Sequence, residues 1–257
     1  MDPLRIFDDN LQEARGLLTF YDTFLTTSQR DIRQAFRSQA NRMLRQASGL
    51  KTFRNRSNSK GAFVFFTDSC PMGWKHLRHA ALRPFLRMAL VQAVSAMDCY
   101  FHDQIEWHYG RILSTATKKA NSRFLSFPIP TGAVKNAIDS YTRTTVGLRI
   151  AFQKELRRVS IQGPGAIEDT LRIIGVRKFW AKVSRTVGVD TETLLLWLNQ
   201  IATRRNQIVH EGDRIPLQNG RLSRPRDIRR NDVEDDIHVL DCFVYAIHDV
   251  IEAEATA

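Results

Sequence analysis

The chain has 257 residues and a mass of 29.6 kDa, which suits one large domain or one domain with a small extension. Its apolar fraction of 43% is sufficient for a buried core, and its basic residues outnumber its acidic ones, so the composition argues against an intrinsically disordered or acidic protein. Lys and Arg number 38 against 27 Asp and Glu, which gives a net charge of +11, and 29 of the 38 cations are Arg. The planar guanidinium of Arg binds phosphate at two points, so this excess fits a polyanion-binding protein. A GC-rich genome would produce the same bias.

Several protein classes are excluded because their sequence signals are missing. No run of 18 apolar residues occurs, so no transmembrane helix is expected. The acidic segment 1–10 lacks the basic and apolar layout of a signal peptide. Cys70, Cys99 and Cys242 are widely spaced and form no Cys-x-x-Cys pair, which argues against a disulfide framework and a cysteine zinc site. We therefore expect a protein of the reducing cytoplasm, with no membrane partner, no metal and no cofactor.

Apolar residues recur at helical spacing along most of the chain, which predicts an all-α fold. The predicted helices span about residues 9–26, 28–48, 74–113, 132–156, 162–174, 178–186, 190–210 and 231 onward. Pro84 is expected to mark a kink or the first turn of the third of these helices. Residues 54–61 and 215–230 are predicted to be loops. The apolar run 63–66 is interpreted as a buried connector, because no partner strands follow it.

Capping residues predict where the helix at 190–210 begins and ends. Asp190 or Thr191 is expected to cap its N-terminus, and Gly212 is expected to end it just after His210. The final helix carries apolar residues at steps of three and four, which is typical of a face packed in a core. This stripe consists of Val233, Ile237, Leu240, Val244, Ile247 and Ile251.

Positive charge is concentrated in two segments. Residues 30–60 contain nine Lys and Arg and one acid, Asp31, so about one-eighth of the chain carries a net charge of +8. The second segment, 221–230, contains five Arg. The acids at 232–236 that follow it suit the positive end of the last helix. We interpret both basic segments as surfaces that face a polyanion.

The common catalytic motifs are absent. The sequence contains no His-Glu-x-x-His, no Gly-x-Ser-x-Gly and no Gly-rich phosphate loop. Asp98, His102 and Glu106 lie one helical turn apart, but no second His shares their face, so we interpret them as satisfied or solvated polar groups rather than a metal site. No helix-turn-helix or basic-zipper pattern supports a DNA-binding regulator.

Residues 204–213, Arg-Arg-Asn-Gln-Ile-Val-His-Glu-Gly-Asp, contain the groups needed to cleave RNA without a metal. His can take the proton of the ribose 2′-OH or protonate the leaving 5′ oxygen, and Arg can neutralise the charge that builds on the phosphate. Because the 2′-OH is the attacking group, DNA would not be cut in this way. Arg205 and His210 lie about 140° and about 7.5 Å apart on a straight helix. Loosening of the last turn at Gly212, or a second copy of the helix across a two-fold axis, would bring an Arg and a His together.

In this context the sequence resembles the HEPN superfamily, whose signature is Arg, a polar residue that is often Asn, a few further residues and His. Asn206 directly follows Arg205, two apolar residues precede His210, and Glu-Gly follows it at the end of a Leu-rich helix.

The stretch 161–210 looks like the RiboL-PSP branch of that superfamily. It has a short helix ending in Ile-Ile-Gly, a helix led by Phe179-Trp180, and the Leu-rich helix that carries the motif. The earlier helix 89–105 is similar to the first core helix of the family. The resemblance covers about residues 63–257, and the basic N-terminal pair of helices lies outside it.

The resemblance implies a HEPN-like helical bundle at 61–257 preceded by a basic helical extension at 1–60. It implies a metal-independent endoribonuclease of toxin, antiviral-defence or RNA-processing systems, with its active site at the cleft of a homodimer. The expected partners are RNA, a second copy of the chain, and a regulatory or antitoxin protein. The alternative is a non-catalytic HEPN-type module that binds nucleic acid or protein.

Carried over to this chain, the family motif makes Arg205 and His210 catalytic and Asn206 a supporting polar residue. An acid on the first core helix often assists, and Asp98 and Asp103 are both candidates. The residues expected to bind RNA are Arg30, Arg33, Arg37, Arg42, Arg45, Arg204, Arg226 and Arg229.

Overall fold

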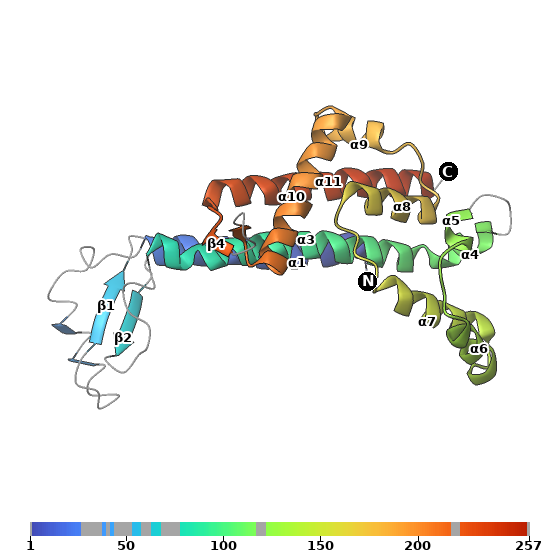
Figure 1. The fold of residues 1–257 in the computed structure, drawn as a ribbon, viewed down its shortest axis with the longest axis horizontal. Coiled ribbons are helices and arrows are strands. Elements are labelled where there is room, and N and C mark those ends of the chain that lie inside the picture. Colours follow the sequence, from blue (N-terminus) through green and yellow to red (C-terminus); the bar gives the residue numbers. More distant parts are fainter. Residues whose placement is uncertain are drawn as a thin grey trace. The chain divides into compact units, whose positions relative to one another are not determined.

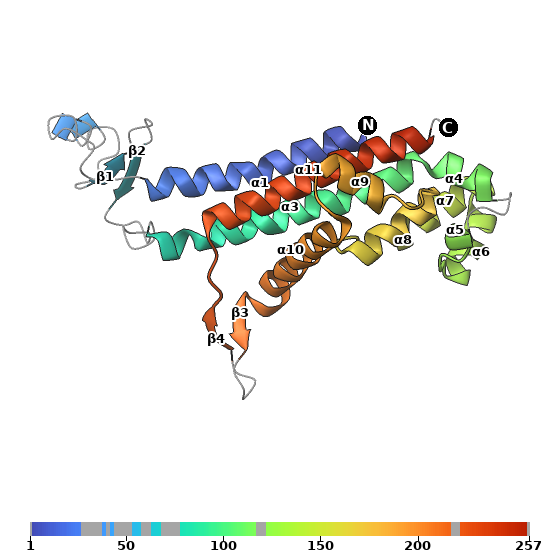
Figure 2. The same cartoon turned by 90° about the horizontal axis from the view of Figure 1, so that it is seen from above.

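The computed structural model of the protein describes residues 2–26, 38–39, 42–43, 53–57, 63–67, 78–116, 122–216 and 222–255. Within these residues the chain is predominantly helical (Figures 1 and 2), which confirms the all-α prediction at this level. The helices are α1 (Pro3–Leu25), α3 (His79–Trp107), α4 (Tyr109–Ala116), α5 (Ser122–Leu125), α6 (Thr131–Ser140), α7 (Thr144–Leu156), α8 (Pro164–Ile174), α9 (Trp180–Val187), α10 (Thr191–Glu211) and α11 (Arg230–Ala255). No described helix is long and apolar enough to cross a membrane.

The chain divides into two compact units. The larger contains residues 1–12, 90–226 and 235–257, and the smaller contains residues 13–89 and 227–234. Helices α1, α3 and α11 therefore contribute residues to both units. The expected division of the sequence after residue 60 stays a prediction.

The core of the larger unit forms where α3 and α11 pack with the first residues of α1. Phe7, Tyr100, Phe101 and Phe243 are fully buried, and their rings meet in a chain with centroid separations of 6.0, 5.3 and 6.3 Å. Trp180 of α9 stacks on Phe243 at 6.0 Å, so α9 is attached to the same core. The predicted apolar stripe of the last helix is confirmed, because all six of its residues are buried.

In the smaller unit, α1 and α3 pack through aromatic residues. The rings of Phe20 and Phe85 lie 5.7 Å apart. Arg230, at the start of α11, donates a hydrogen bond from Nε to Asp22 Oδ2 at 3.1 Å. The predicted helix 28–48 falls almost wholly outside the described residues, although 38–39 and 42–43 are helical.

Two strand pairs replace segments that were predicted to be loops or connectors. Strand β2 (Phe63–Thr67) pairs antiparallel with β1 (Phe53–Ser57), so the interpretation of 63–66 as a connector was wrong. Its partner precedes it in the chain, within the supposed loop. Strands β3 (Arg214–Pro216) and β4 (Leu222–Pro225) form a second hairpin inside the other supposed loop. Both errors concern pairing between segments, which helical periodicity does not report.

Two predicted helices are each interrupted. The helix predicted at 132–156 is the pair α6 and α7, because Tyr141 is extended, with φ −115° and ψ 130°, and ends α6. Gly147 permits close packing of the pair, since a Cβ there would lie 2.7 Å from Ala137 Cα. The helix predicted at 74–113 is divided into α3 and α4 by a turn at His108. Pro84 lies in the second turn of α3, not the first.

Candidate functional site

Helix α10 begins and ends where the sequence predicts. The Asp190 carboxylate accepts hydrogen bonds from the Thr193 N–H at 2.9 Å and from Thr193 Oγ1 at 2.7 Å, and these bonds lower the pKa of Asp190. At the other end Gly212 is left-handed, with φ 61°, and its N–H donates to the Gln207 carbonyl. This conformation is favourable for Gly. His210 therefore sits in the last turn of a helix with two well-defined ends.

The turn after α10 is held by a buried ion pair. Asp213 is fully buried, and its carboxylate contacts the Arg204 guanidinium from Nη1 to Oδ1 at 2.8 Å and from Nη2 to Oδ2 at 3.1 Å. The Arg226 N–H donates to the Asp213 carbonyl at 2.7 Å, which ties the end of β4 to the same turn. Arg204, expected to bind RNA, thus makes a structural contact at the end of the motif helix.

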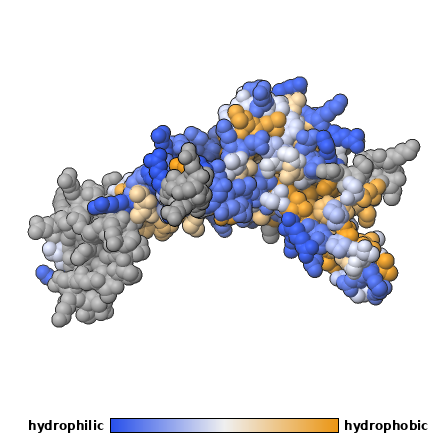
Figure 3. Space-filling view, viewed as in Figure 1, coloured by the Kyte–Doolittle hydropathy of each residue, from blue (hydrophilic) through white to orange (hydrophobic). Residues whose placement is uncertain are grey.

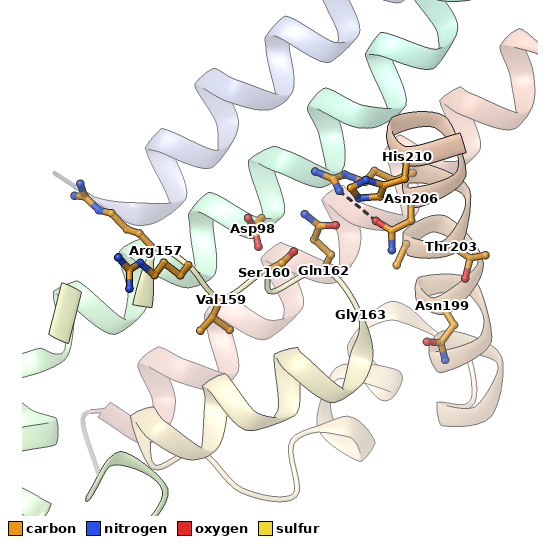
Figure 4. Close-up of a pocket in the computed structure, with 13 residues that line it drawn as sticks. Asp98, Arg157, Val159, Ser160, Gln162, Gly163, Asn199, Thr203, Asn206 and His210 are labelled. Carbon is orange, nitrogen blue, oxygen red and sulfur yellow. Dashed lines mark hydrogen bonds between the residues drawn. The ribbon is translucent and has the colours of Figure 1, made fainter. Parts of the chain in front are cut away.

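An open pocket of about 790 Å³ lies beside α10 within the larger unit (Figure 4). One wall is the side of α10 that carries Asn199, Thr203, Asn206 and His210. The opposite wall is residues 157–163, which connect α7 to α8, together with Asp98 of α3. Figure 4 shows Asp98, Ser160 and Gln162 between Arg157 on one side and the α10 residues on the other.

The three residues of the sequence motif all line this pocket. Asn206 and His210 are one turn apart on an exposed face of α10. Arg205 projects from a neighbouring angle, but its long side chain reaches the same face, where Nη1 donates to Asn206 Oδ1 at 3.2 Å. The Arg205 Nε is buried and has no hydrogen-bond partner among the described residues. Arg205 and His210 therefore line the same pocket although they project from the helix at different angles.

Asp98 and His102 fix the opposite wall to α3. Asp98 Oδ1 accepts a hydrogen bond from the Ile161 N–H, and His102 Nε2 donates to the Val159 carbonyl at 3.0 Å. Only one ring nitrogen of His102 is thus satisfied, since its Nδ1 is buried and has no hydrogen-bond partner among the described residues. Gln162, which follows this anchored stretch, is buried and lines the pocket. Among the described residues, no group of three or more His, Cys, Asp or Glu is arranged to hold a metal ion.

The two candidate assisting acids occupy different environments. Asp98 lines the pocket, whereas Asp103, five residues later on α3, does not. The pKa of Asp103 is raised, chiefly by burial and also by the charge of Glu106, although His102 and Arg157 act in the opposite direction. Asp98 is the candidate that the fold brings to the motif.

The pocket is lined by more positive than negative charge. Arg157, Arg158 and Arg205 contribute to it, and Asp98 is the one acid among the described residues that line it. Arg157 Nη2 lies 3.8 Å from Glu106 Oε1 and its side chain is 74% exposed, so it is partly free to bind an anion. The sequence analysis missed Arg157, Arg158 and Gln162. The Arg-Arg pair before Gln-Gly-Pro was a visible signal, but nothing local placed it opposite α10.

The remaining residues expected to bind RNA are distributed as follows. Arg30, Arg33, Arg37 and Arg45 lie outside the described residues, and Arg42 is helical and exposed. In the larger unit, Arg226 Nη2 lies 3.8 Å from Glu211 Oε2. In the smaller unit, the largely exposed Arg229 lies 3.9 Å from Asp227. Their contacts with RNA stay predictions.

Comparison of the chain with protein-family models, with curated proteins and with solved structures gave no match.

Proposed function

We propose that this protein is a metal-independent endoribonuclease of the HEPN type, close to the RiboL-PSP branch. The main observation behind the proposal is that Arg205, Asn206 and His210 line one pocket. Arg157 and Arg158 line the same pocket. A polyanion is the substrate class that such a wall attracts. The Arg-Asn-x-x-x-His sequence supplies the reactive groups.

The reaction follows from these groups. His210 takes the proton of a ribose 2′-OH, and the 2′ oxygen attacks the adjacent phosphorus. Arg205 neutralises the charge that builds on the non-bridging oxygens, which is the largest stabilising contribution available in a site of this kind. The P–O5′ bond breaks with its electron pair on the 5′ oxygen, and that oxygen is protonated. The products are a 2′,3′-cyclic phosphate and a 5′-hydroxyl.

Asn206 and Asp98 support this chemistry by position. The bond from Arg205 Nη1 to Asn206 Oδ1 directs the guanidinium toward the pocket. Asp98 holds Ile161 and so places Gln162, whose side chain can donate to a phosphate oxygen. The Asp98 carboxylate lies on the pocket wall and is the group available there to orient an imidazolium or a hydroxyl.

The cleavage needs both a base and an acid, and His210 is the one His among the described residues that line the pocket. A second copy of the chain, facing the exposed side of α10, would supply the second imidazole. We therefore propose a homodimer as the active form. A dimer made across this face is isologous, so each copy contributes the same residues.

The test is incubation of the purified protein with total RNA and with DNA of matched sequence, both in EDTA. We expect RNA cleavage alone, with 2′,3′-cyclic phosphate ends. Arg205→Ala and His210→Ala should lower the rate by about 10²-fold or more. Arg185→Ala on α9 and His238→Ala on α11, both exposed and absent from the pocket lining, should leave it unchanged. Full activity of His210→Ala would overturn the assignment of the catalytic pair.

A second candidate function is RNA binding without cleavage. It is favoured by the presence of three Arg but a single imidazole on the pocket wall. Under this alternative, RNA binding would depend strongly on salt, and no RNA would be cleaved at any concentration.

A further inference from the structure

A second cavity lies between α6 and α7, next to the pocket that Arg205, Asn206 and His210 line, which we call the motif pocket. Its volume is about 510 Å³, within the range of small-ligand sites. Arg158 lines both cavities, so the two share a wall at the end of α7. Any chain bound across the motif pocket toward Arg158 would therefore reach the second cavity.

The second cavity has one aromatic ring next to a small and aliphatic part of its wall. Tyr141, in the turn between α6 and α7, is partly buried and lines it together with Ala137, Gly147 and Ala151. The ring lies tightly against Gly147, since a Cβ there would be 2.8 Å from Tyr141 Cδ2. The ring is thus held in place before any ligand binds, which lowers the entropy lost on binding.

The polar groups of this cavity are of two kinds. Asn136 Oδ1 accepts a hydrogen bond from Ser140 Oγ at 2.7 Å, which orients the amide so that its NH₂ is the group offered to a ligand. Lys154 is exposed, and Arg158 Nη1 contacts Glu155 Oε2 at 2.7 Å. One carboxylate is therefore matched by one guanidinium, and the Lys154 ammonium gives the cavity a net positive charge.

A stacking ring, an oriented amide and a cation are the features that bind an unpaired nucleobase and its phosphate. An apolar peptide side chain would use the aliphatic part of the wall but neither the amide nor the cations. We infer that the cavity between α6 and α7 is a subsite for one unpaired nucleobase of an RNA strand, with Tyr141 as the stacking platform and Arg158 next to the phosphate that joins it to the motif pocket. This inference rests on the proposed function for the identity of the strand.

The consequence for substrate choice is that single-stranded RNA is preferred over duplex. A base in a duplex is stacked and paired, so it would have to leave the stack to enter the cavity, at a cost in free energy. Unpaired loops and single strands already present free bases. The proposed nuclease would accordingly cut near unpaired nucleotides.

The experiment uses the full chain with His210→Ala, so that RNA is bound but not consumed. The dissociation constant of a short fluorescent single-stranded RNA is measured by anisotropy. We expect Tyr141→Ala to weaken binding about tenfold, the scale of one lost base stack. Tyr141→Phe retains the ring and should bind like the parent. Lys154→Ala should weaken binding more than Lys135→Ala, a matched loss of one exposed Lys on the same helical pair and outside the cavity lining.

Crosslinking gives an independent location for the base. RNA that contains 4-thiouridine should crosslink to the peptide around Tyr141 on irradiation, as read by mass spectrometry. An unchanged dissociation constant in Tyr141→Ala, or crosslinks confined to other helices, would overturn the subsite. Free mononucleotides that bind as tightly as the strand would overturn the assignment to RNA in favour of a small nucleotide ligand.

The same measurements separate this inference from the proposed catalysis. If the unaltered protein binds and crosslinks RNA at Tyr141 but cleaves none, the subsite is supported and the nuclease proposal is overturned. If it cleaves RNA and Tyr141→Ala binds and cleaves like the parent, the nuclease proposal is supported and the subsite is overturned.

Discussion

The Arg204 guanidinium holds the Asp213 carboxylate by two contacts across the turn that ends α10. Asp213 is fully buried and has a left-handed backbone, with φ 56°. Its partner is the immediate sequence neighbour of Arg205, whose guanidinium lines the pocket. Two adjacent Arg residues therefore have separate roles. One fixes the end of the helix that carries His210, and the other is available to a ligand.

Arg204→Ala is expected to lower the free energy of unfolding by about 3–5 kcal/mol, because it removes the cation that contacts the buried Asp213 carboxylate. Urea unfolding followed by circular dichroism measures this change. Adding Asp213→Asn should recover part of the loss, since Asn removes the charge and tolerates a left-handed backbone. If the double variant were no more stable than the single one, the uncompensated charge would not be the cause.

Asp98→Asn is expected to lower RNA cleavage by about 100-fold, whereas Asp103→Asn is expected to leave it unchanged. Asp98 lines the pocket and Asp103 does not. The amide oxygen of Asn can still accept the Ile161 N–H, so the wall of the pocket should persist. Initial cleavage rates of the two variants on one RNA substrate decide between the two acids. A larger loss of rate in Asp103→Asn than in Asp98→Asn would show that Asp103 is the assisting acid.

Stability should fall on acidification because of His108, which is buried between α3 and α4. Burial and the charge of Arg111 lower its pKa below the ordinary value of 6.5, while Glu252, 3.8 Å away, acts against them. A lowered His pKa means that the unfolded chain binds a proton more readily. The contribution of neutral His108 to the free energy of unfolding is therefore fully present above about pH 6.5 and is lost as the pH falls through the folded-state pKa of His108.

His108→Gln should accordingly show a smaller loss of stability between about pH 7 and about pH 5 than the unaltered protein. His238→Gln, on the exposed face of α11, serves as the control and should follow the unaltered protein. Parallel pH profiles for all three chains would mean that His108 does not contribute.

Gly147→Ala is expected to destabilise the packing of α6 on α7 by about 1–3 kcal/mol, because its Cβ would overlap backbone and side-chain atoms of Ala137. Amide hydrogen exchange should become faster in α6 and α7 and stay unchanged in α10. Gly110→Ala is the matched control, since a Cβ there meets nothing within 4 Å and Ala favours helix. Equal rates of amide hydrogen exchange in Gly147→Ala and Gly110→Ala would contradict the close approach of α6 to α7 at Gly147.

The candidate site was predictable to the extent that it depends on α10. The capping rules placed Asp190 and Gly212, and the motif lies at the end they define. The position of Arg157 and Arg158 on the opposite wall was not predictable, because nothing in the neighbouring sequence places them opposite α10. The choice between the two candidate acids also needed the fold.

The sequence by itself determined the helical class, the ends of α10, the buried stripe of α11 and the residues of the Arg-Asn-x-x-x-His motif. Each depends on groups a few positions apart, through capping bonds or the helical repeat, so local rules suffice. Only the tertiary structure decided that Asp98 and Ile161, 63 positions apart, join opposite Arg205 and His210. It also decided that a second cavity, lined by Tyr141, shares Arg158 with that pocket. Those neighbours are set by how buried faces pack against one another, and the spacing of residues along the chain does not record that packing.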